Sequence, residues 1–407
     1  MESAIAAVRD KPLNAQCGKV RVLFVPGFVA DTYSEIEKQY VELCARHNLD
    51  IEFVWLVPDI SCRYNRFARA ESRASLSEPV WVEHLRRANI PYIVGNISAF
   101  NPFSNFALFY RIFSKQRIDA VYTHFGVERF WATLLGKLWG KVTIWNEHWH
   151  SLSTKWTKPK RLFYRLFVDE FIAVSAFIAS TLPANHRIHV VRNAIFAKAR
   201  TALNPGERAA MRKRLNLPQA DTMVLLVSAF RPNKYHDLAV DVCAKVLRRH
   251  PAAFFVFLGE GVTRPPIQRR IEELGLADRV FMPGHVDNVD DYYLVSDICM
   301  LTSLGEPCAL AVVEAMKFAK PLVAFNSGGT PERIQHERTG FLIEARDTDG
   351  FADAIADLLK NDTKRVQLGQ NALAAVREQA DRNKWISELT SLLKDIVSKR
   401  RAIASAP

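Results

Sequence analysis

The sequence contains no long hydrophobic run. Its uninterrupted apolar stretches all fall short of the roughly 18 residues that a membrane-spanning helix requires. The N-terminal stretch Met1 to Pro12 carries Glu2, Arg9 and Asp10 around a short apolar segment, which makes it too charged for a signal peptide. We therefore expect a cytoplasmic protein without a spanning segment.

Cysteine is also scarce. The 407 residues include six cysteines, and no two of them have C-x-x-C or C-x-x-x-C spacing. They are Cys17, Cys44, Cys62, Cys243, Cys299 and Cys308. We expect no disulfide framework, no metal site of either the cysteine or the Asp-x-Asp kind, and no cofactor. Cys243 and Cys299 lie within apolar patterns, which is typical of buried thiols.

Acidic residues are fewer than basic ones. The chain has 43 Asp and Glu against 55 Lys and Arg, a formal net charge of +12. This excess favours an anionic partner, namely nucleotide phosphates, nucleic acid or an acidic membrane face, although a basic chain can also lack such a partner. Nucleic acid is not expected, because a nucleic-acid binder ordinarily shows a base-reading motif or a stacking platform, and the sequence has neither.

Neither a disordered chain nor a membrane bundle fits a composition that is 49% hydrophobic and 24% charged. A chain of 407 residues exceeds what one hydrophobic core usually supports, which favours two domains. Short β-rich runs alternate with longer amphipathic helical patterns throughout. This alternation is typical of the α/β class, in which crossover helices connect the strands of parallel sheets.

The expected strands form two series. The first comprises residues 20–25, 51–57, 91–94, 119–123, 142–145, 171–174 and 189–191. The second comprises residues 223–230, 254–258, 279–282, 298–302, 321–324 and 340–343.

The charged, Pro-containing stretch 193–221 separates the two series and contains a short helix of its own. We therefore expect an N-terminal domain of residues 1–195 and a C-terminal domain of residues 196–380. Residues 361–400 indicate two helices, and the terminal segment 381–407 is expected to pack back on the N-terminal domain.

Ligands of open α/β sheets bind beyond the carboxyl ends of the strands. In the loop after the fourth strand of the second series, Pro307 is typical of a first helical position, with Glu306 at the start of the helix. The free backbone N–H groups of Cys308, Ala309 and Leu310 would then form an anion site suited to a phosphate.

Glu314 lies seven residues after Pro307, on the same helical face and about 10 Å along the axis. Two carboxylates so placed, Glu306 and Glu314, can contact two parts of one ligand, one near a sugar and one near ribose hydroxyls. The alternative is that Glu306 only caps the helix and Glu314 is an ordinary surface residue.

A longer pattern surrounds these carboxylates. It consists of Glu306, seven residues, Glu314, then Ala315-Met316, Pro321-Leu322-Val323-Ala324 and Ser327-Gly328-Gly329-Thr330-Pro331-Glu332. The block from Ser303 to Ile343 resembles the donor-site signature of glycosyltransferase family 4, a retaining group with the GT-B fold. The resemblance implies two Rossmann-like, doubly wound domains that face each other across a cleft, with a nucleoside diphosphate sugar as donor.

The resemblance extends to residues 227–234, at the place of the family's Gly-Arg-Leu…Lys-Gly loop. Lys234 falls on the lysine that holds the donor diphosphate. Ala229 occupies the family's arginine position, and we expect Arg231 to reach the phosphates instead, because a guanidinium suits bidentate phosphate contact. The alternative is a solvated loop arginine. His285 replaces the aromatic residue that the family packs against the base, so the base is not readable.

The first half resembles the family more loosely. His124 and His148 end two expected strands, and His148 is the better match to the histidine that the family places near the reacting sugar. The alternative is a structural histidine. Gly27 follows the first strand, where relatives carry a glycine-rich loop that approaches the donor phosphate and the acceptor, although a single turn glycine also has an ordinary explanation.

Two stretches, 100–117 and 155–167, mix cations with aromatic residues. A basic amphipathic helix with Trp and Phe can lie in a membrane interface and attract anionic lipid, which would suit a lipid-linked acceptor. The alternative is that Phe163, Leu166 and Phe167 are core contacts of a crossover helix whose lysines face water.

The resemblance implies the transfer of a hexose, with retention, to a hydroxyl of a glycan or lipid-linked saccharide, as in surface polysaccharide or glycolipid synthesis. Glu306 would orient the sugar, Glu314 would bind the ribose, and His148 would lie near the sugar or the acceptor. Lys234 and Arg231 would stabilise the leaving diphosphate without a metal. The alternatives are a sugar-nucleotide epimerase or hydrolase of the same fold, and a degenerate, non-catalytic binding protein.

Overall fold

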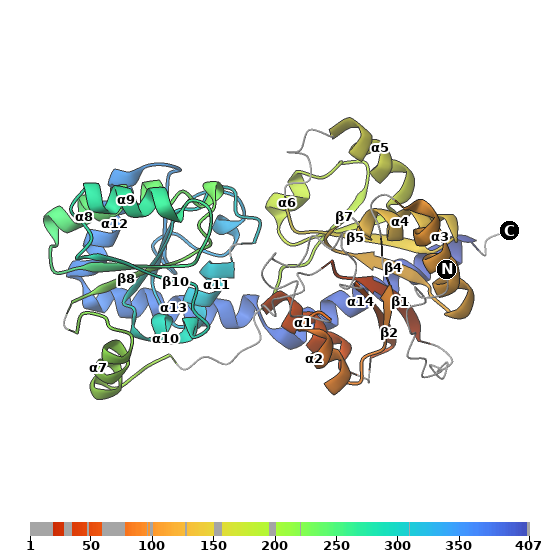
Figure 1. The fold of residues 1–407 in the computed structure, drawn as a ribbon, viewed down its shortest axis with the longest axis horizontal. Coiled ribbons are helices and arrows are strands. Elements are labelled where there is room, and N and C mark those ends of the chain that lie inside the picture. The colour runs from red at the N-terminus through yellow and green to blue at the C-terminus, as the bar shows by residue number, and fades with distance from the viewer. Residues whose placement is uncertain are drawn as a thin grey trace. The chain divides into compact units, whose positions relative to one another are not determined.

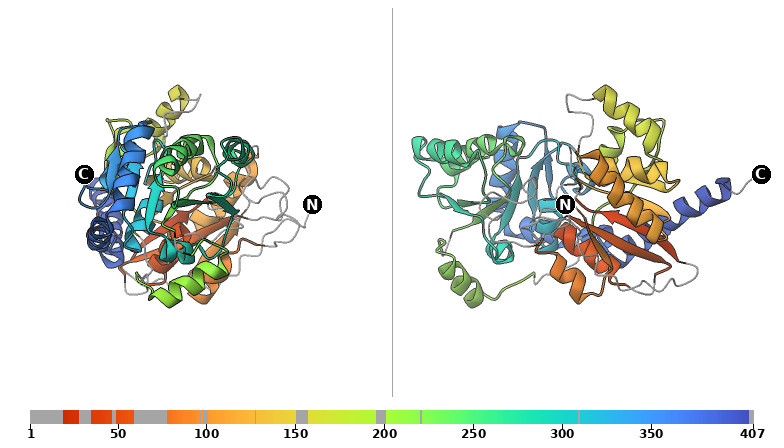
Figure 2. Two further views of the ribbon diagram at one scale, coloured as in Figure 1. Left: turned by 90° about the vertical axis from the view of Figure 1, so that its left-hand side faces the viewer. Right: turned by 45° about the vertical axis from the view of Figure 1, so that its right-hand side comes forward.

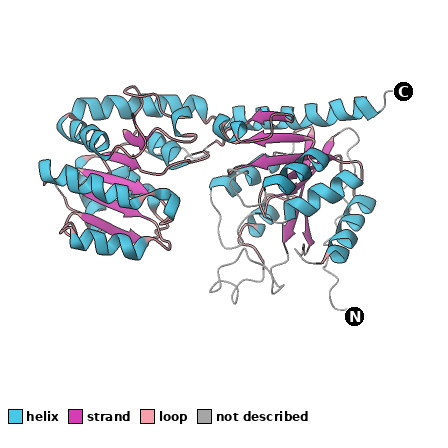
Figure 3. Ribbon diagram, turned by 90° about the horizontal axis from the view of Figure 1, so that it is seen from above, coloured by secondary structure: helices cyan, strands magenta, loops and turns pink. Residues whose placement is uncertain are grey.

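The computed structural model describes residues 19–404, apart from 28–34, 47–48, 59–77, 96, 98–100, 127, 150–156, 195–200, 220 and 309. The chain forms two compact units (Figure 1). Unit 1 comprises Met1–Ala194 together with Arg382–Pro407, and unit 2 comprises Ile195–Asp381. In each unit a sheet lies between helices, as the view coloured by secondary structure shows (Figure 3).

The sheet of unit 1 is wholly parallel, in the order β3-β2-β1-β4-β5-β6-β7. Its strands are β1 (Val20–Val25), β2 (Ile51–Pro58), β3 (Tyr92–Gly95), β4 (Ala120–Thr123), β5 (Val142–Glu147), β6 (Glu170–Ala173) and β7 (Arg187–Val190). Strands buried on both faces read as continuous apolar runs, which is why the sequence indicated them. The strand order reverses between β1 and β4, so the loops that follow these two strands diverge and leave room for a ligand.

Helices cover both faces of this sheet. They are α1 (Glu35–Cys44), α2 (Val82–Arg87), α3 (Pro102–Lys115), α4 (Glu128–Leu138), α5 (Thr157–Phe167), α6 (Ala176–Ser180) and α14 (Arg382–Ala404). Side chains of α3 and α4, such as Phe109 and Leu135, share one core with Leu23 and Val121 of the sheet.

Helix α14 comes from the end of the chain and packs on unit 1 (Figure 2). Its cations pair with acids that directly precede strands of the sheet: Lys394 Nζ lies 2.6 Å from Asp50 Oδ2, and Arg401 and Arg400 pair with Asp119 and Asp169. These ion pairs join α14 to the N-terminal ends of β2, β4 and β6.

Unit 2 repeats the same wound order, β10-β9-β8-β11-β12-β13, again wholly parallel. Its strands are β8 (Met223–Val227), β9 (Phe254–Leu258), β10 (Val280–Gly284), β11 (Ile298–Leu301), β12 (Leu322–Phe325) and β13 (Phe341–Ile343). Its helices are α7 (Pro205–Arg214), α8 (His236–Arg249), α9 (Arg264–Glu273), α10 (Val289–Val295), α11 (Leu310–Lys317), α12 (Thr348–Lys360) and α13 (Asp362–Gln379), with 3-10 turns η2 (Pro232–Lys234) and η3 (Thr330–Glu332). The order reverses between β8 and β11.

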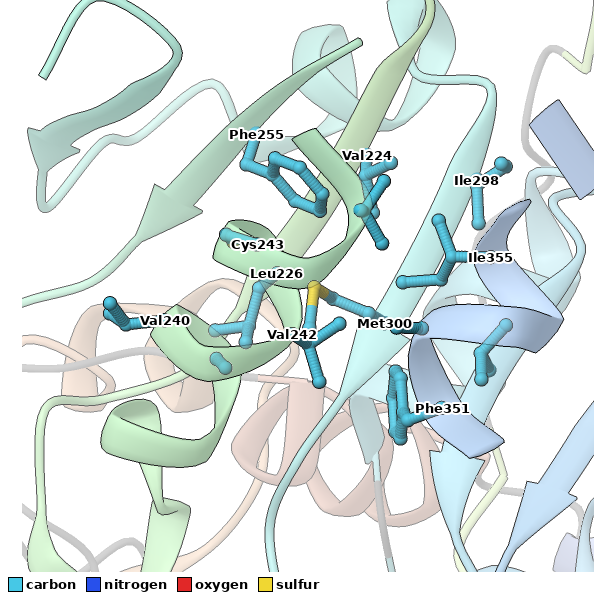
Figure 4. Close-up of a cluster of buried hydrophobic side chains, with 14 of the residues drawn as sticks. Val224, Leu226, Val240, Val242, Cys243, Phe255, Ile298, Met300, Phe351 and Ile355 are labelled. Carbon is cyan, nitrogen blue, oxygen red and sulfur yellow. The ribbon is translucent and has the colours of Figure 1, made fainter. Parts of the chain in front are cut away.

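Two apolar clusters hold unit 2 together, one on each face of its sheet. Under α8 and α12, Leu226, Met300, Val242 and Phe351 point toward one another (Figure 4). Cys243 and Cys299 are buried free thiols, one in each cluster, as their apolar surroundings in the sequence indicated.

The expectation of an α/β fold with two series of parallel strands is confirmed, since every expected strand is present with ends shifted by at most a few residues. Residues 361–400 form two helices, α13 and α14, as expected. Among the residues that the structure describes, no helix is both long and apolar enough to cross a membrane.

We predict that Trp385→Ala lowers the free energy of unfolding of unit 1 by about 3–5 kcal/mol, because a buried tryptophan leaves a cavity. Trp385 is 3% exposed and packs edge-on against Tyr40, with ring centroids 5.3 Å apart. Native-state hydrogen exchange of unit 1 amides measures the loss. Ile403→Ala, on the same helix but 59% exposed, is the control and should cost less than about 0.5 kcal/mol. Equal losses in the two variants would contradict the packing role of α14.

Candidate active site

The loops at the switch point of the second sheet bring together a lysine and a carboxylate. Lys234 ends η2, which follows β8, and Glu306 follows β11, the neighbour of β8. The Lys234 ammonium donates to Glu306 Oε1 in an ion pair whose side chains are 20% and 9% exposed. The loops are also joined through backbone: Thr302 Oγ1 donates to the Lys234 carbonyl at 3.1 Å, and the Leu304 amide to the Asn233 carbonyl at 3.3 Å.

The loop after β12 packs against the loop that carries Glu306. Gly328 has φ +64°, and a Cβ there would lie 2.5 Å from the Glu306 carbonyl oxygen. The Gly329 amide donates to that same oxygen at 2.7 Å, and Ser327 Oγ accepts from the Gly305 amide at 3.0 Å. The Ser-Gly-Gly run is therefore explained by close backbone contact, since a side chain at Gly328 would displace Glu306.

The expectation that a helix begins at Pro307 is wrong. Helix α11 begins at Leu310, and Pro307 and Cys308 lie in a bend. The physical reason is that the Glu306 carbonyl, which a helix starting at Pro307 would use for its first hydrogen bond, accepts from Gly329 instead.

The structure describes only part of the expected anion site. Cys308 is buried, with Arg333 Nη2 3.8 Å from its sulfur. Ala309 lies outside the described residues. The described part of the expected site is therefore Cys308 in the bend and Leu310 at the start of α11.

Glu314 lies on α11 and is held by a residue that sequence reasoning missed. The Tyr293 hydroxyl of α10 donates to Glu314 Oε2 at 3.0 Å. Burial, and then the negative charge of Glu314, raise the pKa of Tyr293 well above its ordinary value, so the hydroxyl remains a donor. No motif marks Tyr293 in the sequence, because its role depends on α10 packing beside α11.

Two other expected donor residues stand apart from the ion pair. Arg231 lies in the same loop as Lys234 but is exposed, and among the described residues no hydrogen bond or ion pair joins its side chain to Lys234 or Glu306. His285 follows β10, two strands from β8, with its side chain 70% exposed and Nε2 3.8 Å from Asp287 Oδ1. The structure brings together Lys234 and Glu306, and neither Arg231 nor His285 joins them through a side chain.

Contrary to the expectation that the chain lacks an Asp-x-Asp motif, Asp347-Thr348-Asp349 is one. Both carboxylates have structural partners. Asp347 caps α12 by accepting from the Gly350 amide at 2.9 Å, and Asp349 pairs with Lys245 at 2.6 Å. Within the described ranges no three His, Cys, Asp or Glu side chains form a group that could hold a metal.

In unit 1 the two expected histidines meet. His124 follows β4 and His148 follows β5, and because these strands are paired in parallel, His148 Nε2 lies 2.9 Å from His124 Nδ1. The Phe125 ring lies against His148, with centroids 4.5 Å apart. Gly27, after β1, has φ +57°, and a Cβ there would lie 2.3 Å from the Phe125 carbonyl oxygen. Gly27 and His148 thus belong to one cluster at the switch point of the first sheet.

A buried polar network adjoins this cluster. The Asn146 amide donates to Tyr122 at 2.6 Å and to Tyr40 at 3.0 Å. Arg129, a residue that sequence reasoning missed, donates to the His124 carbonyl at 2.7 Å and lies 3.6 Å from Glu147.

The histidine pair is neutral in the folded protein. Burial, and then the Arg129 charge, lower the pKa of His148 to about 3. Burial first, then the neighbouring His148 ring and the Arg129 charge, lower the pKa of His124 well below its ordinary value. At neutral pH each ring therefore offers one donor and one acceptor, and His148 can present a neutral imidazole to a ligand.

Residues 207–374 match the family model of "Glycosyl transferases group 1". This range contains Arg231, Lys234, Glu306 and Glu314 of unit 2, whereas Gly27 and His148 of unit 1 lie outside it.

Curated relatives match over similar lengths. The N-acetyl-alpha-D-glucosaminyl L-malate synthase of Bacillus anthracis is 30% identical over 187 residues, 46% of this chain and 49% of that protein. The GDP-mannose-dependent alpha-(1-6)-phosphatidylinositol monomannoside mannosyltransferase of Mycobacterium tuberculosis is 32% identical over 175 residues, 41% of this chain and 45% of that protein. The chain thus spans about half the length of the curated relatives it matches.

Solved structures resemble nearly the whole chain in fold. A glycosyltransferase from Rickettsia africae has a TM-score of 0.75 at 19% identity and covers 93% of this chain and 99% of its own. Anabaena HepE in complex with UDP-glucose has a TM-score of 0.75 at 18% identity, with 92% and 99% covered. Together with the two wound sheets, these likenesses show the GT-B fold.

We predict that His148 does not titrate near neutrality. A lowered pKa means that protonation destabilises unit 1, so the stabilising contribution of the neutral ring is full above the unfolded pKa of about 6.5 and falls as the pH drops toward the folded value. The ring signals of His148, assigned with His148→Gln in ¹⁵N-histidine-labelled protein, should stay constant between about pH 8 and pH 5. A midpoint above about pH 5.5 for His148 would contradict its burial in a neutral pair.

We also predict that Gly27→Ala destabilises unit 1 by about 1–3 kcal/mol more than Gly140→Ala. Both glycines have positive φ, +57° and +69°, so both variants carry the same backbone strain. Only at Gly27 does the new methyl group meet backbone, because nothing lies within 4 Å of a Cβ at Gly140. Urea unfolding of the two variants measures the difference, and equal losses would show that the loop after β1 does not need a close approach to Phe125.

Proposed function

We propose that the chain is a retaining hexosyltransferase with a nucleoside diphosphate sugar as donor, because residues 207–374 match the family model of glycosyl transferases group 1. The observation that carries the proposal is the Lys234–Glu306 ion pair at the switch point of the second sheet. A cation and a carboxylate in contact suit a ligand that is itself anionic at one end and a polyol at the other.

In this proposal Lys234 and Glu306 bind different parts of the donor. Lys234 contacts the diphosphate, and the exposed Arg231 reaches the same phosphates from its loop. The amide groups at the start of α11 supply further positive potential, so the leaving diphosphate is stabilised by preorganised charge without a metal. Glu306 exchanges its partner Lys234 for the sugar hydroxyls, Glu314 accepts from the ribose, and His285 borders the base.

His148 supplies a neutral imidazole on the acceptor side. A neutral ring can accept a proton from, or donate a hydrogen bond to, a sugar or acceptor hydroxyl without placing a positive charge beside the reacting carbon. The contact with His124 orients the ring, and Gly27 lies close to the backbone of Phe125, whose ring lies against His148.

The acceptor we propose is a saccharide or a lipid-linked saccharide. The Mycobacterium tuberculosis relative is named for a phosphatidylinositol mannoside, which supports a lipid-linked acceptor in glycolipid or surface polysaccharide synthesis. We place the reaction in the cytoplasm, at a membrane face when the acceptor is lipid-linked.

A non-catalytic nucleotide-sugar binding protein is the second candidate. Ala229 at the family's arginine position favours it, because a methyl group cannot hold the diphosphate. Nucleotide release in the presence of saccharide acceptors separates the two functions.

We predict that one nucleotide or its hexose conjugate, from a panel of UDP, GDP and ADP compounds, raises the melting temperature. A ligand at about 100 times its Kd should add roughly 2.7 kcal/mol to the stability of the folded state. Lys234→Ala should abolish the shift, whereas Glu306→Gln should retain the shift by the free nucleotide and lose the extra shift by the sugar conjugate. Each variant should lower turnover by about 10²–10³-fold.

Lys245→Ala is the matched control, because it also removes an ion-paired lysine of unit 2, one that pairs with Asp349 on α12. It should leave the nucleotide shift and turnover unchanged. If no compound of the panel stabilises the folded protein, the donor assignment is wrong. If a compound binds but no acceptor stimulates its breakdown, the binding-protein function is supported instead.

A further inference from the structure

Three neighbouring helices of unit 1 expose apolar side chains to solvent. Helix α4 lies between α3 and α5 (Figure 1): Trp139, just after α4, contacts Phe106 of α3 at 5.2 Å, and Phe130 of α4 contacts Phe163 of α5 at 5.3 Å, both between ring centroids. Of the eleven exposed large hydrophobic side chains among the described residues, six lie on these helices. They are Phe103, Phe106, Tyr110, Leu138, Leu162 and Leu166, which we call the outer face of α3–α5.

The aromatic part of this face lies on α3. Phe103, Phe106 and Tyr110 are spaced by three and four residues, which places them on one side of the helix. Phe103 is 85% exposed, and the rings of Phe106 and Tyr110 stack with centroids 6.4 Å apart. Three exposed aromatic rings on one side of a helix form an apolar patch, and exposed apolar patches often mark a site of interaction.

The cationic part lies on α5. Leu162 and Leu166 are 57% and 53% exposed, and Lys158, Arg161 and Arg165 occupy the same exposed side at helical spacing. The opposite side is inward: Tyr164 is fully buried, and Phe163 and Phe167 contact each other with centroids 5.1 Å apart. Of the three side chains that the sequence offered as core contacts, Phe163 and Phe167 therefore pack inward, whereas Leu166 faces solvent.

The charge on these helices is almost entirely positive. Helices α3, α4 and α5 carry eight Lys and Arg and a single acid, Glu128, which is 8% exposed. Within the described part of the chain, no ion pair joins Lys158, Arg161 or Arg165 to an acid. Solvent-exposed leucines and phenylalanines beside unpaired cations match the interface of an anionic bilayer, where apolar groups meet acyl chains and cations meet phosphates.

We propose that the outer face of α3–α5 binds an anionic lipid bilayer, with Phe103, Leu162 and Leu166 in the interface and Lys158, Arg161 and Arg165 at lipid phosphates. A second copy of this chain fits less well, because it would set cations against cations. A nucleic acid fits less well too, because the cations of α5 lie beside Leu162 and Leu166, where a nucleic-acid site would place aromatic rings for stacking. The proposal deepens the proposed function, since it brings unit 1 to a lipid-linked acceptor.

Flotation of the full chain with vesicles tests the proposal. Vesicles of phosphatidylcholine with phosphatidylglycerol should carry the protein upward, and vesicles of phosphatidylcholine alone should not. R161E/R165E should weaken binding by about tenfold or more, since each basic residue near an anionic surface contributes several-fold. L162S/L166S should also weaken it, and added salt should weaken binding of the wild-type chain.

Two control variants match these changes on unit 2. R248E/R269E changes the net charge equally through exposed arginines, and V262S/V366S removes exposed apolar side chains, 80% and 64% exposed. Both should bind vesicles like the wild-type chain. Equal losses in test and control variants, no dependence on phosphatidylglycerol, or displacement from vesicles by an RNA oligonucleotide would each overturn the proposal.

The outcome is independent of the donor site. Melting-temperature shifts with nucleotides report on unit 2 and should be the same in R161E/R165E and in the wild-type chain. A chain that binds nucleotide but no anionic vesicle would remove this surface alone. A chain that binds anionic vesicles through this face but no nucleotide would support the surface and remove the proposed function.

Discussion

The reversal of strand order within each parallel sheet is the constraint on which both candidate clusters depend. At β8 and β11, and again at β1 and β4, neighbouring strands end together while their following chains leave in opposite directions. Residues far apart in sequence then meet without any need for a long side chain. Lys234 and Glu306 are 72 positions apart and form an ion pair, and Gly27 lies against the backbone of Phe125.

Backbone hydrogen bonds hold these loops in place. The Glu306 loop is fastened on one side by the Leu304 amide and on the other by Gly329. A carboxylate on such a loop loses little conformational entropy when it contacts a ligand, which is the benefit of a preorganised site. The same fastening explains why α11 starts late, because the carbonyl that would open the helix is already used. Local helix preference at Pro307 is weaker than this tertiary hydrogen bond.

The two units handle charge differently. In the histidine cluster of unit 1, burial keeps His124 and His148 neutral, so their contact is a hydrogen bond between uncharged rings. On the outer face of α3–α5 the cations are exposed and few acids offset them. In unit 2 the exposed Arg231 and the paired Lys234 leave positive charge at the switch point. The basic residues of this chain are thus gathered at particular places, rather than spread evenly over its surface.

The alternation of apolar runs with amphipathic helices determined the α/β class and the places of the strands, because burial on both faces leaves a continuous apolar pattern that needs no distant contact to be recognised. The motifs around Lys234, Glu306 and His148 likewise indicated which loops to consider. Only the tertiary structure decided that Lys234 pairs with Glu306, that Tyr293 holds Glu314, that His124 meets His148, and that Leu166 faces solvent. Each of these depends on which elements become neighbours, and periodicity within one segment carries no information about that.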